Sequence, residues 1–358
     1  MIKIAFVIGT RPEIIKMSPV IRECIAQKIE YFIIHSNQHY SKNMDAIFFD
    51  ELELPLPQYN LNVCSSLHGE MTAKIITGVE KILIKEKPNW VLVQGDTNTV
   101  MASSLAASKL QIRIGHIEAG LRSYDRSMPE EVNRIITDHI SDLLFVPTQK
   151  QENILLKEGI LPNKIQITGN TIVDAVYQNL KLANNHSEFN HYQFEKYFLL
   201  TTHRPSNVDN KKNLNNLLSV ITETSIKHNC FVYFPIHPRT KKQINKFGIL
   251  INNKYIKLIN PVGYLEMLSL EKNAKLILTD SGGIQEEACI LQVPSVVLRK
   301  NTERPETLEV GSSILIDFNS TKFFLDVDTM LKKQRNWLNP FGDGNSAQKI
   351  INSILQYE

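Results

Sequence analysis

Short apolar segments of strand length alternate with helical segments along almost the whole chain of 358 residues. This alternation predicts βαβ units, in which parallel strands form a sheet and helices cover both of its faces. A chain of this length is better divided into two domains than packed around one core. The predicted strands lie at 2–8, 31–35, 90–94, 112–116, 143–146, 165–168, 197–201, 230–234, 256–259, 275–279, 295–298 and 313–316.

A polar stretch rich in asparagine interrupts the alternation at 181–190, and we predict a linker or surface loop there. The domain division is expected close to it, with an N-terminal domain over 1–172 and a C-terminal domain over 173–340. The chain ends in a segment whose apolar residues at 350, 351, 354 and 355 mark one face of a helix.

Composition excludes several classes of protein. A net charge of +3, without a run rich in lysine and arginine, gives no indication of a nucleic-acid partner. No apolar segment has the length of a membrane span or of a signal peptide, so no membrane association is expected. The four cysteines are scattered without C-x-x-C spacing, which argues against zinc and disulfide frameworks and indicates a reducing cytoplasm.

A turn of serine and glycine follows the predicted strand at 275–279 and leads into a helix. Gly282 and Gly283 let backbone N–H groups approach a ligand closely, and the start of a helix attracts negative charge. Glu286 and Glu287 come one turn later, where a ribose hydroxyl could bind. The segment therefore predicts a site for a nucleotide diphosphate in the C-terminal half.

Three acidic residues of the N-terminal half, Asp96, Glu118 and Glu130, each lie near the end of a predicted strand or the start of a helix. Ligands bind at the carboxyl edge of α/β sheets. Converging carboxylates predict proton transfer, because crowding and burial separate their pKa values. The alternatives are that Asp96 caps a helix, that Glu130 complements a helix dipole, or that the acids bind a divalent metal, which no ligand spacing supports.

Basic residues lie close to the same strand ends. Arg11 and Lys16 follow the first strand at or near the positive end of a helix, where the dipole does not stabilise cations, so we expect an anionic partner. Arg134 shares a helix face with Glu130 at i,i+4 spacing. The alternative for Arg11 and Lys16 is that they are solvated surface residues.

Histidines and arginines follow two strands of the C-terminal half. His203 could hand a proton to a departing phosphate, which Arg204 could neutralise. His237 and Arg239 repeat this arrangement after another strand. The alternative is a structural histidine beside a surface arginine. In the N-terminal half, His116 could equally be a satisfied, half-buried residue.

Taken in order, these segments resemble the non-hydrolysing UDP-N-acetylglucosamine 2-epimerases, from residue 1 to about residue 355. Several motifs in a fixed order make the resemblance specific, whereas the glycine turn alone would be a weak signal. The motifs are Gly9-Thr10-Arg11-Pro12-Glu13 with Lys16, Gln94-Gly95-Asp96-Thr97, His116-Ile117-Glu118-Ala119-Gly120-Leu121-Arg122, Pro129-Glu130-Glu131 with Asn133-Arg134, Thr202-His203-Arg204, Asp280-Ser281-Gly282-Gly283-Ile284-Gln285-Glu286-Glu287 and Thr302-Glu303-Arg304-Pro305-Glu306.

The resemblance implies a glycosyltransferase-B-like α/β fold of two Rossmann-like domains, with the active site in the cleft between them. It also implies that the C-terminal helix, 341–358, packs back on the N-terminal domain, that the protein is a homodimer, and that it uses no cofactor and no metal. The implied reaction interconverts UDP-GlcNAc and UDP-ManNAc at C2, through elimination and re-addition of UDP with 2-acetamidoglucal as the intermediate.

By similarity, Asp96, Glu118 and Glu130 handle protons, and His203 assists the leaving phosphate. The residues expected to hold the substrate or its UDP part are Arg11, Lys16, Arg134, Ser281, Gly282, Gly283, Glu287 and Arg304.

Some positions depart from the pattern. Ser206 stands where many bacterial members have glutamate, so it is left out of the site. The stretches 37–44 and 68–72 look like a sister branch that epimerises UDP-2,3-diacetamido-2,3-dideoxy-glucuronic acid, and we expect the allosteric UDP-GlcNAc activation of some relatives to be altered or absent. That sugar acid is the alternative substrate. More distant alternatives are a glycosyltransferase with the same fold and a catalytically silent UDP-sugar-binding protein.

Overall fold

The computed structural model describes residues 2–37, 48–63, 67–186, 188–189, 196–251, 253–316 and 320–357. The chain forms two compact units: unit 1 comprises Met1–Gln178 and Phe341–Glu358, and unit 2 comprises Asn179–Pro340. We expected a division between 172 and 173, and the contact pattern divides the chain a little later, inside the helix α7 (Thr171–Asn184).

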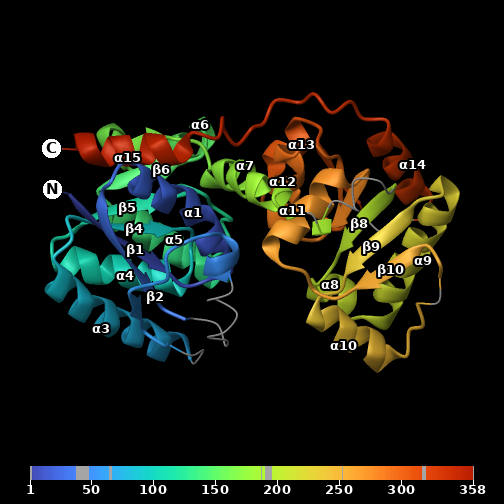
Figure 1. Cartoon of the computed structure of the whole chain (residues 1–358), viewed down its shortest axis with the longest axis horizontal. Coiled ribbons are helices and arrows are strands. Elements are labelled where there is room, and N and C mark those ends of the chain that lie inside the picture. Colours follow the sequence, from blue (N-terminus) through green and yellow to red (C-terminus); the bar gives the residue numbers. More distant parts are fainter. Residues whose placement is uncertain are drawn as a thin grey trace. The chain divides into compact units, whose positions relative to one another are not determined.

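Unit 1 is built around a parallel sheet with the strand order β3-β2-β1-β4-β5-β6-β7 (Figure 1). The central strands consist almost entirely of buried apolar residues, as expected for a sheet that is covered on both faces. The strands are β1 (Lys3–Ile8), β2 (Glu30–His35), β3 (Tyr59–Asn60), β4 (Trp90–Gln94), β5 (Arg113–Ile117), β6 (Leu143–Val146) and β7 (Ile165–Ile167).

Helices cover this sheet in two layers. The helices α3, α4 and α5 pack side by side on one face, and α1 packs with the C-terminal helix α15 on the other (Figure 1). The helical segments of this unit are α1 (Arg11–Ala26), α3 (His68–Glu86), α4 (Asn98–Lys109), α5 (Pro129–Ile140), α6 (Gln149–Lys157), η1 (Pro162–Lys164), α7 and α15 (Ser346–Gln356).

Unit 2 repeats the plan with a parallel sheet of the order β10-β9-β8-β11-β12-β13. Its strands are β8 (Tyr197–Thr201), β9 (Phe231–Pro235), β10 (Ile256–Ile259), β11 (Leu276–Thr279), β12 (Ser295–Val297) and β13 (Ser313–Leu315). Its helices are α8 (Pro205–Val208), α9 (Lys211–His228), α10 (Pro238–Phe247), α11 (Tyr264–Asn273), α12 (Gly282–Ile290), α13 (Pro305–Glu309) and α14 (Ser320–Leu331).

All the predicted strands are present in the two sheets, and their bounds agree with the prediction to within one residue. The sequence prediction missed β3, which has only two residues and lies at the edge of its sheet. The prediction of a linker at 181–190 is wrong for residues 181–184, which continue α7, because a polar composition with lysine, leucine and alanine does not prevent a helix. Residues 187 and 190 lie outside the described part.

The C-terminal helix α15 docks on unit 1 through its apolar face. Ile350, Ile351 and Ile354 are buried as predicted, whereas Leu355 is exposed. Beyond the helix, the ring of Tyr357 meets that of Trp90 edge-on, with 5.1 Å between the centroids. Residues from the end of the chain therefore complete the N-terminal unit.

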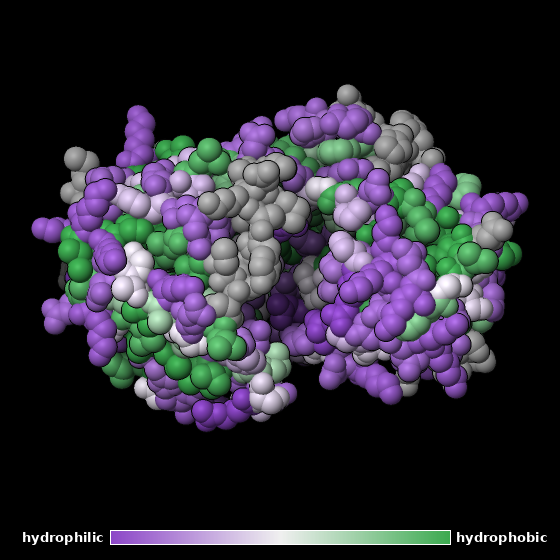
Figure 2. All heavy atoms as spheres, turned by 90° about the horizontal axis from the view of Figure 1, so that it is seen from below, coloured by the Kyte–Doolittle hydropathy of each residue, from purple (hydrophilic) through white to green (hydrophobic). Residues whose placement is uncertain are grey.

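The surface of unit 2 around α10 is strongly hydrophilic (Figure 2). Only Thr240 and Ile244 of this helix are buried, and its lysines at 241, 242 and 246 are exposed. Within the described residues, no helix combines the length and the apolar character that crossing a membrane requires.

Three of the four cysteines lie in the described part, and they are free and buried. Burial raises the pKa of the Cys24 thiol to about 12 and that of Cys289 to about 11. Both therefore stay protonated at neutral pH, which is unsuitable for a nucleophile. Cys64, and residues 38–44 of the stretch that resembles the sister branch, lie outside the described residues.

Candidate active site

Both sheets have a topological switch point. There, two neighbouring parallel strands are each followed by a connection, and the two connections lead toward opposite edges of the sheet. In unit 1 the switch point lies between β1 and β4, and in unit 2 between β8 and β11. Loops diverge at the carboxyl ends of such strands, which is where open α/β sheets bind ligands. The predicted site residues follow these four strands or β5, the neighbour of β4, with the exceptions of Glu130, Arg134 and Arg304.

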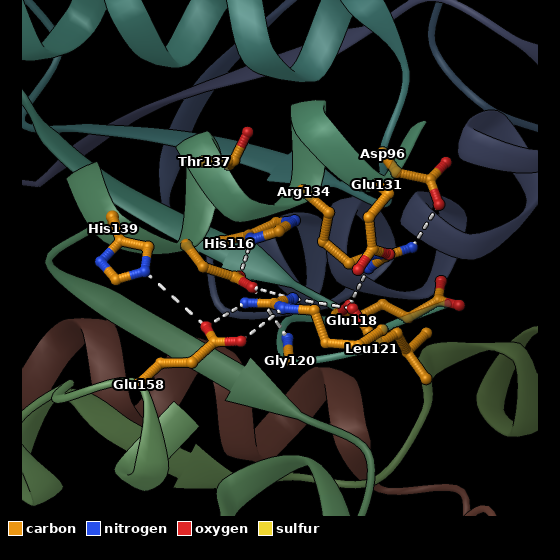
Figure 3. A network of polar contacts seen from close by, with 12 residues as sticks. Asp96, His116, Glu118, Gly120, Leu121, Glu131, Arg134, Thr137, His139 and Glu158 are labelled. Carbon is orange, nitrogen blue, oxygen red and sulfur yellow. Dashed lines mark hydrogen bonds and ion pairs between the residues drawn. The ribbon is translucent and has the colours of Figure 1, made fainter. Parts of the chain in front are cut away.

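Arg134 joins two of the predicted acids in unit 1 (Figure 3). Its Nη2 lies 2.5 Å from Oδ2 of Asp96, and its Nη1 donates to the backbone carbonyl of Glu118. Arg134 is buried, whereas about a third of the Asp96 side chain is exposed. A buried guanidinium therefore ties the end of β4 to the end of β5 and leaves part of the Asp96 carboxylate accessible.

Glu118 lies deeper than Asp96 and is held by two donors. Lys16 Nζ lies 2.7 Å from its Oε2, and the side-chain amide of Gln94 donates to the same oxygen. The anionic partner expected for Lys16 is thus Glu118. Its backbone has a φ of 64°, a conformation that non-glycine residues rarely adopt and that occurs preferentially at functional sites.

The capping interpretation of Asp96 is wrong. The N-cap of α4 is Thr97, whose side chain accepts from Val100 N at 3.4 Å. The carboxylate of Asp96 pairs with Arg134 instead, and Asn133 Nδ2 donates to the Asp96 carbonyl at 2.9 Å.

The two glutamates at the start of α5 have different environments. Glu131 is buried and accepts from Ser123 N at 2.7 Å, Ser123 Oγ at 2.9 Å and Tyr124 N at 3.1 Å. Glu130 is exposed and takes no part in the hydrogen bonds that join Asp96 to Arg134. The fold therefore brings Asp96 and Glu118 together, whereas Glu130 is exposed to solvent at the start of α5.

His116 is fully buried behind these acids. Its Nδ1 lies 2.7 Å from Oδ1 of Asp138, and its Nε2 lies 2.8 Å from the carbonyl of Gly95. Arg122 Nη1 lies 2.7 Å from Oδ2 of Asp138. Burial alone would raise the pKa of Asp138, but the charges of His116 and the arginines outweigh it and lower this pKa. His116 is thus a satisfied buried histidine that supports the turn before Asp96.

The start of α12 has the features of an anion site. Ser281 is its N-cap residue, and no side chain caps the helix. Gly282 and Gly283 have helical backbone conformations, and a Cβ on either would meet no protein atom closer than 3.9 Å. The fold of the protein therefore does not require glycine here, which points to a ligand that approaches the backbone closely.

Asp280 organises the neighbouring turn after β8. Its buried carboxylate accepts from Thr202 Oγ1 at 2.7 Å, from Arg204 N at 2.9 Å and from Asn207 Nδ2 at 3.0 Å. It also accepts from the backbone N of His203 and lies 3.3 Å from Nδ1 of that ring. The carboxylate thus fixes His203 beside the start of α12.

His203 has a second histidine next to it. The ring centroids of His203 and His237 are 5.1 Å apart, and His237 caps α10 by accepting from Arg239 N at 3.1 Å. Burial and the neighbouring His203 lower the pKa of His237. His237 therefore has a structural role at the start of α10, as the alternative interpretation held.

The two glutamates of α12 face different partners. Tyr264 donates its hydroxyl to Oε1 of Glu287 at 2.9 Å, and both residues are buried. Glu286 forms an ion pair of 2.5 Å with Nε of Arg304. The sequence predicts that these two carboxylates lie near a ribose. Glu287 has an environment suited to binding a polar ligand group, whereas Glu286 anchors Arg304.

Glu13 belongs to the motif after the first strand, and the sequence predicts no role for it. Its carboxylate accepts from Gly9 N at 2.5 Å, in the turn that leads into α1. Burial raises the pKa of Glu13 to about 7, although hydrogen bonds from Thr97, Gly9 and Thr10 oppose the shift. The position of Glu13 directly after Pro12 could have indicated a functional role. Nothing in the sequence indicated one for Tyr264. In the described part of the chain, no group of three or more acids, histidines or cysteines is placed to hold a metal.

Together, the parallel sheets and their two switch-point sites define a two-unit α/β protein with the glycosyltransferase-B-like fold. At the level of fold alone, it matches a glycosyltransferase of kitacinnamycin with a TM-score of 0.60 and 12% identity, over 98% of this chain and 93% of that one. The chain belongs to the UDP-N-acetylglucosamine 2-epimerase family, whose model matches residues 22–355.

Relatives cover the chain from end to end. A UDP-N-acetylglucosamine 2-epimerase of Methanococcus maripaludis is 58% identical, with 99% of each chain aligned. The crystal structure of the Methanocaldococcus jannaschii UDP-GlcNAc 2-epimerase in complex with UDP-GlcNAc and UDP matches with a TM-score of 0.87 and 56% identity over the whole of both chains. A UDP-2,3-diacetamido-2,3-dideoxy-D-glucuronate 2-epimerase of Pseudomonas aeruginosa is 40% identical over 88% of each chain.

Proposed function

We propose that this protein is an enzyme that interconverts UDP-GlcNAc and UDP-ManNAc at C2, without a cofactor or a metal. The observation that carries the proposal is a candidate site at the switch point of each unit, one rich in carboxylates and the other suited to a diphosphate. Asp96 and Glu118, joined by Arg134, stand at the switch point of unit 1, and an open helix start beside His203 stands at that of unit 2. The first suits proton transfer and the second suits a diphosphate.

In this proposal the C2 proton passes to a carboxylate, the C–H electron pair forms the C1=C2 double bond, and the C1–O bond breaks toward the diphosphate. The products of this step are UDP and 2-acetamidoglucal. UDP then adds back to C1, and a second acid delivers a proton to the other face of C2. Asp96, Glu118 and Glu130 are assigned to these proton transfers, and Arg11, Lys16 and Arg134 to holding the substrate.

Unit 2 is assigned to the UDP part. Backbone N–H groups of Ser281, Gly282 and Gly283 would hold the phosphates at the positive end of α12. His203, held by Asp280, would assist the departing phosphate. Glu287 would accept from the ribose hydroxyls, and Arg304, anchored by Glu286, would be a further substrate contact.

Proton exchange tests the reaction directly. In D₂O, we expect NMR to show deuterium entering C2 of UDP-GlcNAc and UDP-ManNAc accumulating. The absence of both would refute the substrate assignment. Release of the sugar only onto an added acceptor would instead indicate a glycosyltransferase, which shares the fold.

The alternative substrate is UDP-2,3-diacetamido-2,3-dideoxy-glucuronic acid, which the 40% identical Pseudomonas aeruginosa relative supports. The higher identity of 58% to the Methanococcus maripaludis enzyme favours UDP-GlcNAc. Turnover of the two UDP-sugars, measured side by side, separates the two assignments. We further propose a homodimer in the cytoplasm acting in polysaccharide biosynthesis, and sedimentation of the purified protein tests the dimer.

The two neighbouring glutamates of α5 give a matched pair of variants. We expect Glu130→Gln to lower turnover about 100-fold while the melting temperature stays unchanged, because Glu130 is exposed and is assigned to proton transfer. Glu131→Gln should instead lower the melting temperature, since it weakens the hydrogen bonds to Ser123 and Tyr124. Equal effects of both variants on turnover would contradict the assignment of Glu130.

Gly283→Ala tests whether a ligand, and not the fold, requires glycine at the start of α12. The new Cβ meets no protein atom closer than 3.9 Å, so thermal stability should be unchanged or higher. UDP affinity should fall about tenfold or more, because the methyl group occupies space that the diphosphate needs. Calorimetric titration with UDP measures this loss.

The control for this variant is Gly69→Ala. Gly69 also lies in the first turn of a helix, α3, and a Cβ added there would meet no atom within 4 Å. This control should leave UDP affinity unchanged. Unchanged UDP affinity in Gly283→Ala as well would place the diphosphate elsewhere.

A further inference from the structure

Glu271 of α11 is a buried acid for which the reaction gives no role. Its exposed fraction is 0%, and neither carboxylate oxygen receives an N–H or O–H donor from the described residues. A carboxylate that is buried without a hydrogen-bond donor or a cation beside it is strongly destabilised. Such a group therefore keeps its proton. Glu271 therefore has the environment of a neutral carboxylic acid.

The neighbour of this acid is Glu287, the residue assigned to the ribose. α11 packs against α12 (Figure 1), and the carboxyl groups of Glu271 and Glu287 lie close enough to share a hydrogen bond. Two carboxyl groups can form such a bond only when one of them carries a proton. Burial, and then the charge and the hydrogen bond of Glu287, hold the pKa of Glu271 well above its ordinary value of 4.5.

Two polar side chains that contact the end of α11 are engaged with backbone carbonyls. Tyr197 of β8 donates to the carbonyl of Leu270 at 2.7 Å, and Arg335 donates to the carbonyls of Ala274 and Lys275 at 3.1 Å.

The charged residues nearest in sequence do not neutralise the pair either. Glu286 of α12 forms its ion pair with Arg304, and Lys272 of α11 is exposed. Among the described residues, it is thus the proton on Glu271 that prevents repulsion between two negative charges in this buried pair.

We propose that Glu271 is a positioning residue, which donates its proton to Glu287 and, together with Tyr264, holds the Glu287 carboxylate in the orientation that accepts the ribose hydroxyls of UDP. Tyr264 approaches Oε1 of Glu287 at 2.9 Å. With these two donors in place, Glu287 has a fixed rotamer, and its remaining lone pairs face the nucleotide. The inference rests on the proposed function, because it takes UDP as the ligand of unit 2.

Two substitutions separate the donor from the bulk of the side chain. Glu271→Gln keeps an N–H donor toward Glu287, and Glu271→Met fills the same space without one. We expect the Kd for UDP to stay within about threefold of wild type in Glu271→Gln and to rise about tenfold in Glu271→Met. The ratio of the Kd values for 2′-deoxy-UDP and UDP should fall toward one only in Glu271→Met, a change that a general loss of packing would not produce.

Unfolding without nucleotide tests the shared proton by itself. Because the pKa of Glu271 is raised in the folded state, the native protein holds a proton that the unfolded chain releases above pH 4.5. The contribution of this group to stability therefore falls as the pH rises from about 4.5 toward the native pKa. Both variants lack this titration, so their melting temperatures should decline less with pH than that of wild type.

The experiment combines calorimetric titration of the full-length protein with UDP and 2′-deoxy-UDP and melting curves across pH. Equal nucleotide affinities in Glu271→Gln and Glu271→Met, or a Glu271→Met variant with an unchanged Kd ratio, would overturn the proposal. A wild-type protein that bound no UDP would overturn the proposed function together with the role at the ribose. In that case, a pH dependence that differed between wild type and the variants would still establish the Glu271–Glu287 pair.

Discussion

Asp96→Asn is expected to lower the rate of C2 deuterium exchange by about 100- to 10,000-fold, the range that loss of a general acid or base produces. Asparagine has the shape of aspartate, and its carbonyl oxygen can still accept from Nη2 of Arg134, 2.5 Å from the native carboxylate. The link between the ends of β4 and β5 therefore survives, and only the capacity to carry a proton is removed. The affinity for UDP should remain within about threefold of wild type, since the UDP site belongs to unit 2.

The matched control is Asp328→Asn. Asp328 is also a partly exposed aspartate in an ion pair, with Lys227 at 2.7 Å, and it lies on α14, which packs against α9, β12 and β13 and not at the β8–β11 switch point. This variant should keep full exchange activity. Two results would contradict the assignment of proton transfer to unit 1 and of UDP binding to unit 2. One is an Asp96→Asn variant with near-normal exchange, and the other is a variant that loses UDP affinity as much as turnover.

The pattern of the sequence predicted the two parallel sheets well, because buried strands leave continuous apolar runs and the turns after them are rich in glycine and polar residues. It also placed the candidate residues at strand ends. Topology then explains why they meet: β1 beside β4 and β8 beside β11 create switch points that no local stretch of sequence encodes.

The pairing of side chains could not be predicted in the same way. That Arg134 would bind Asp96 and the carbonyl of Glu118, and that Lys16 would bind the Glu118 carboxylate, depends on residues far apart in the chain. The motif containing Glu130 and Glu131 likewise does not reveal which of them is buried. Local spacing fixes their helix positions, but the loop at 121–128 determines which one finds backbone donors.

Proton chemistry at neutral pH requires acids in unlike environments. In unit 1, Glu13 is buried with a pKa of about 7, Glu118 is buried with cationic and amide donors, and Asp96 is partly exposed beside a guanidinium. This gradation from buried to exposed carboxyl groups arises from one sheet edge, and it is what an enzyme that both removes and delivers a proton at C2 would need.

Asp280→Ala is expected to have the largest effect on stability, lowering the free energy of unfolding by about 3 kcal/mol or more. The substitution leaves Thr202 Oγ1 and the backbone N–H of Arg204 without this acceptor, takes one of the two acceptors of Asn207 Nδ2, and removes the anion beside His203. The turn after β8 should lose its fixed conformation, and the activity should fall with it. Chemical denaturation measures the first effect and C2 exchange the second.

Asp209→Ala serves as the control, because Asp209 is an aspartate of the same turn region whose partners, Arg239 and Gln243, lie at the surface. Exposed ion pairs contribute little to stability, so this variant should unfold like wild type. Asp280→Asn separates charge from shape: its amide oxygen still accepts some of the donors, so its stability should lie between those of wild type and Asp280→Ala. If Asp280→Ala unfolded like wild type, the buried carboxylate would not be the group that organises the turn, and the placement of His203 would need another cause.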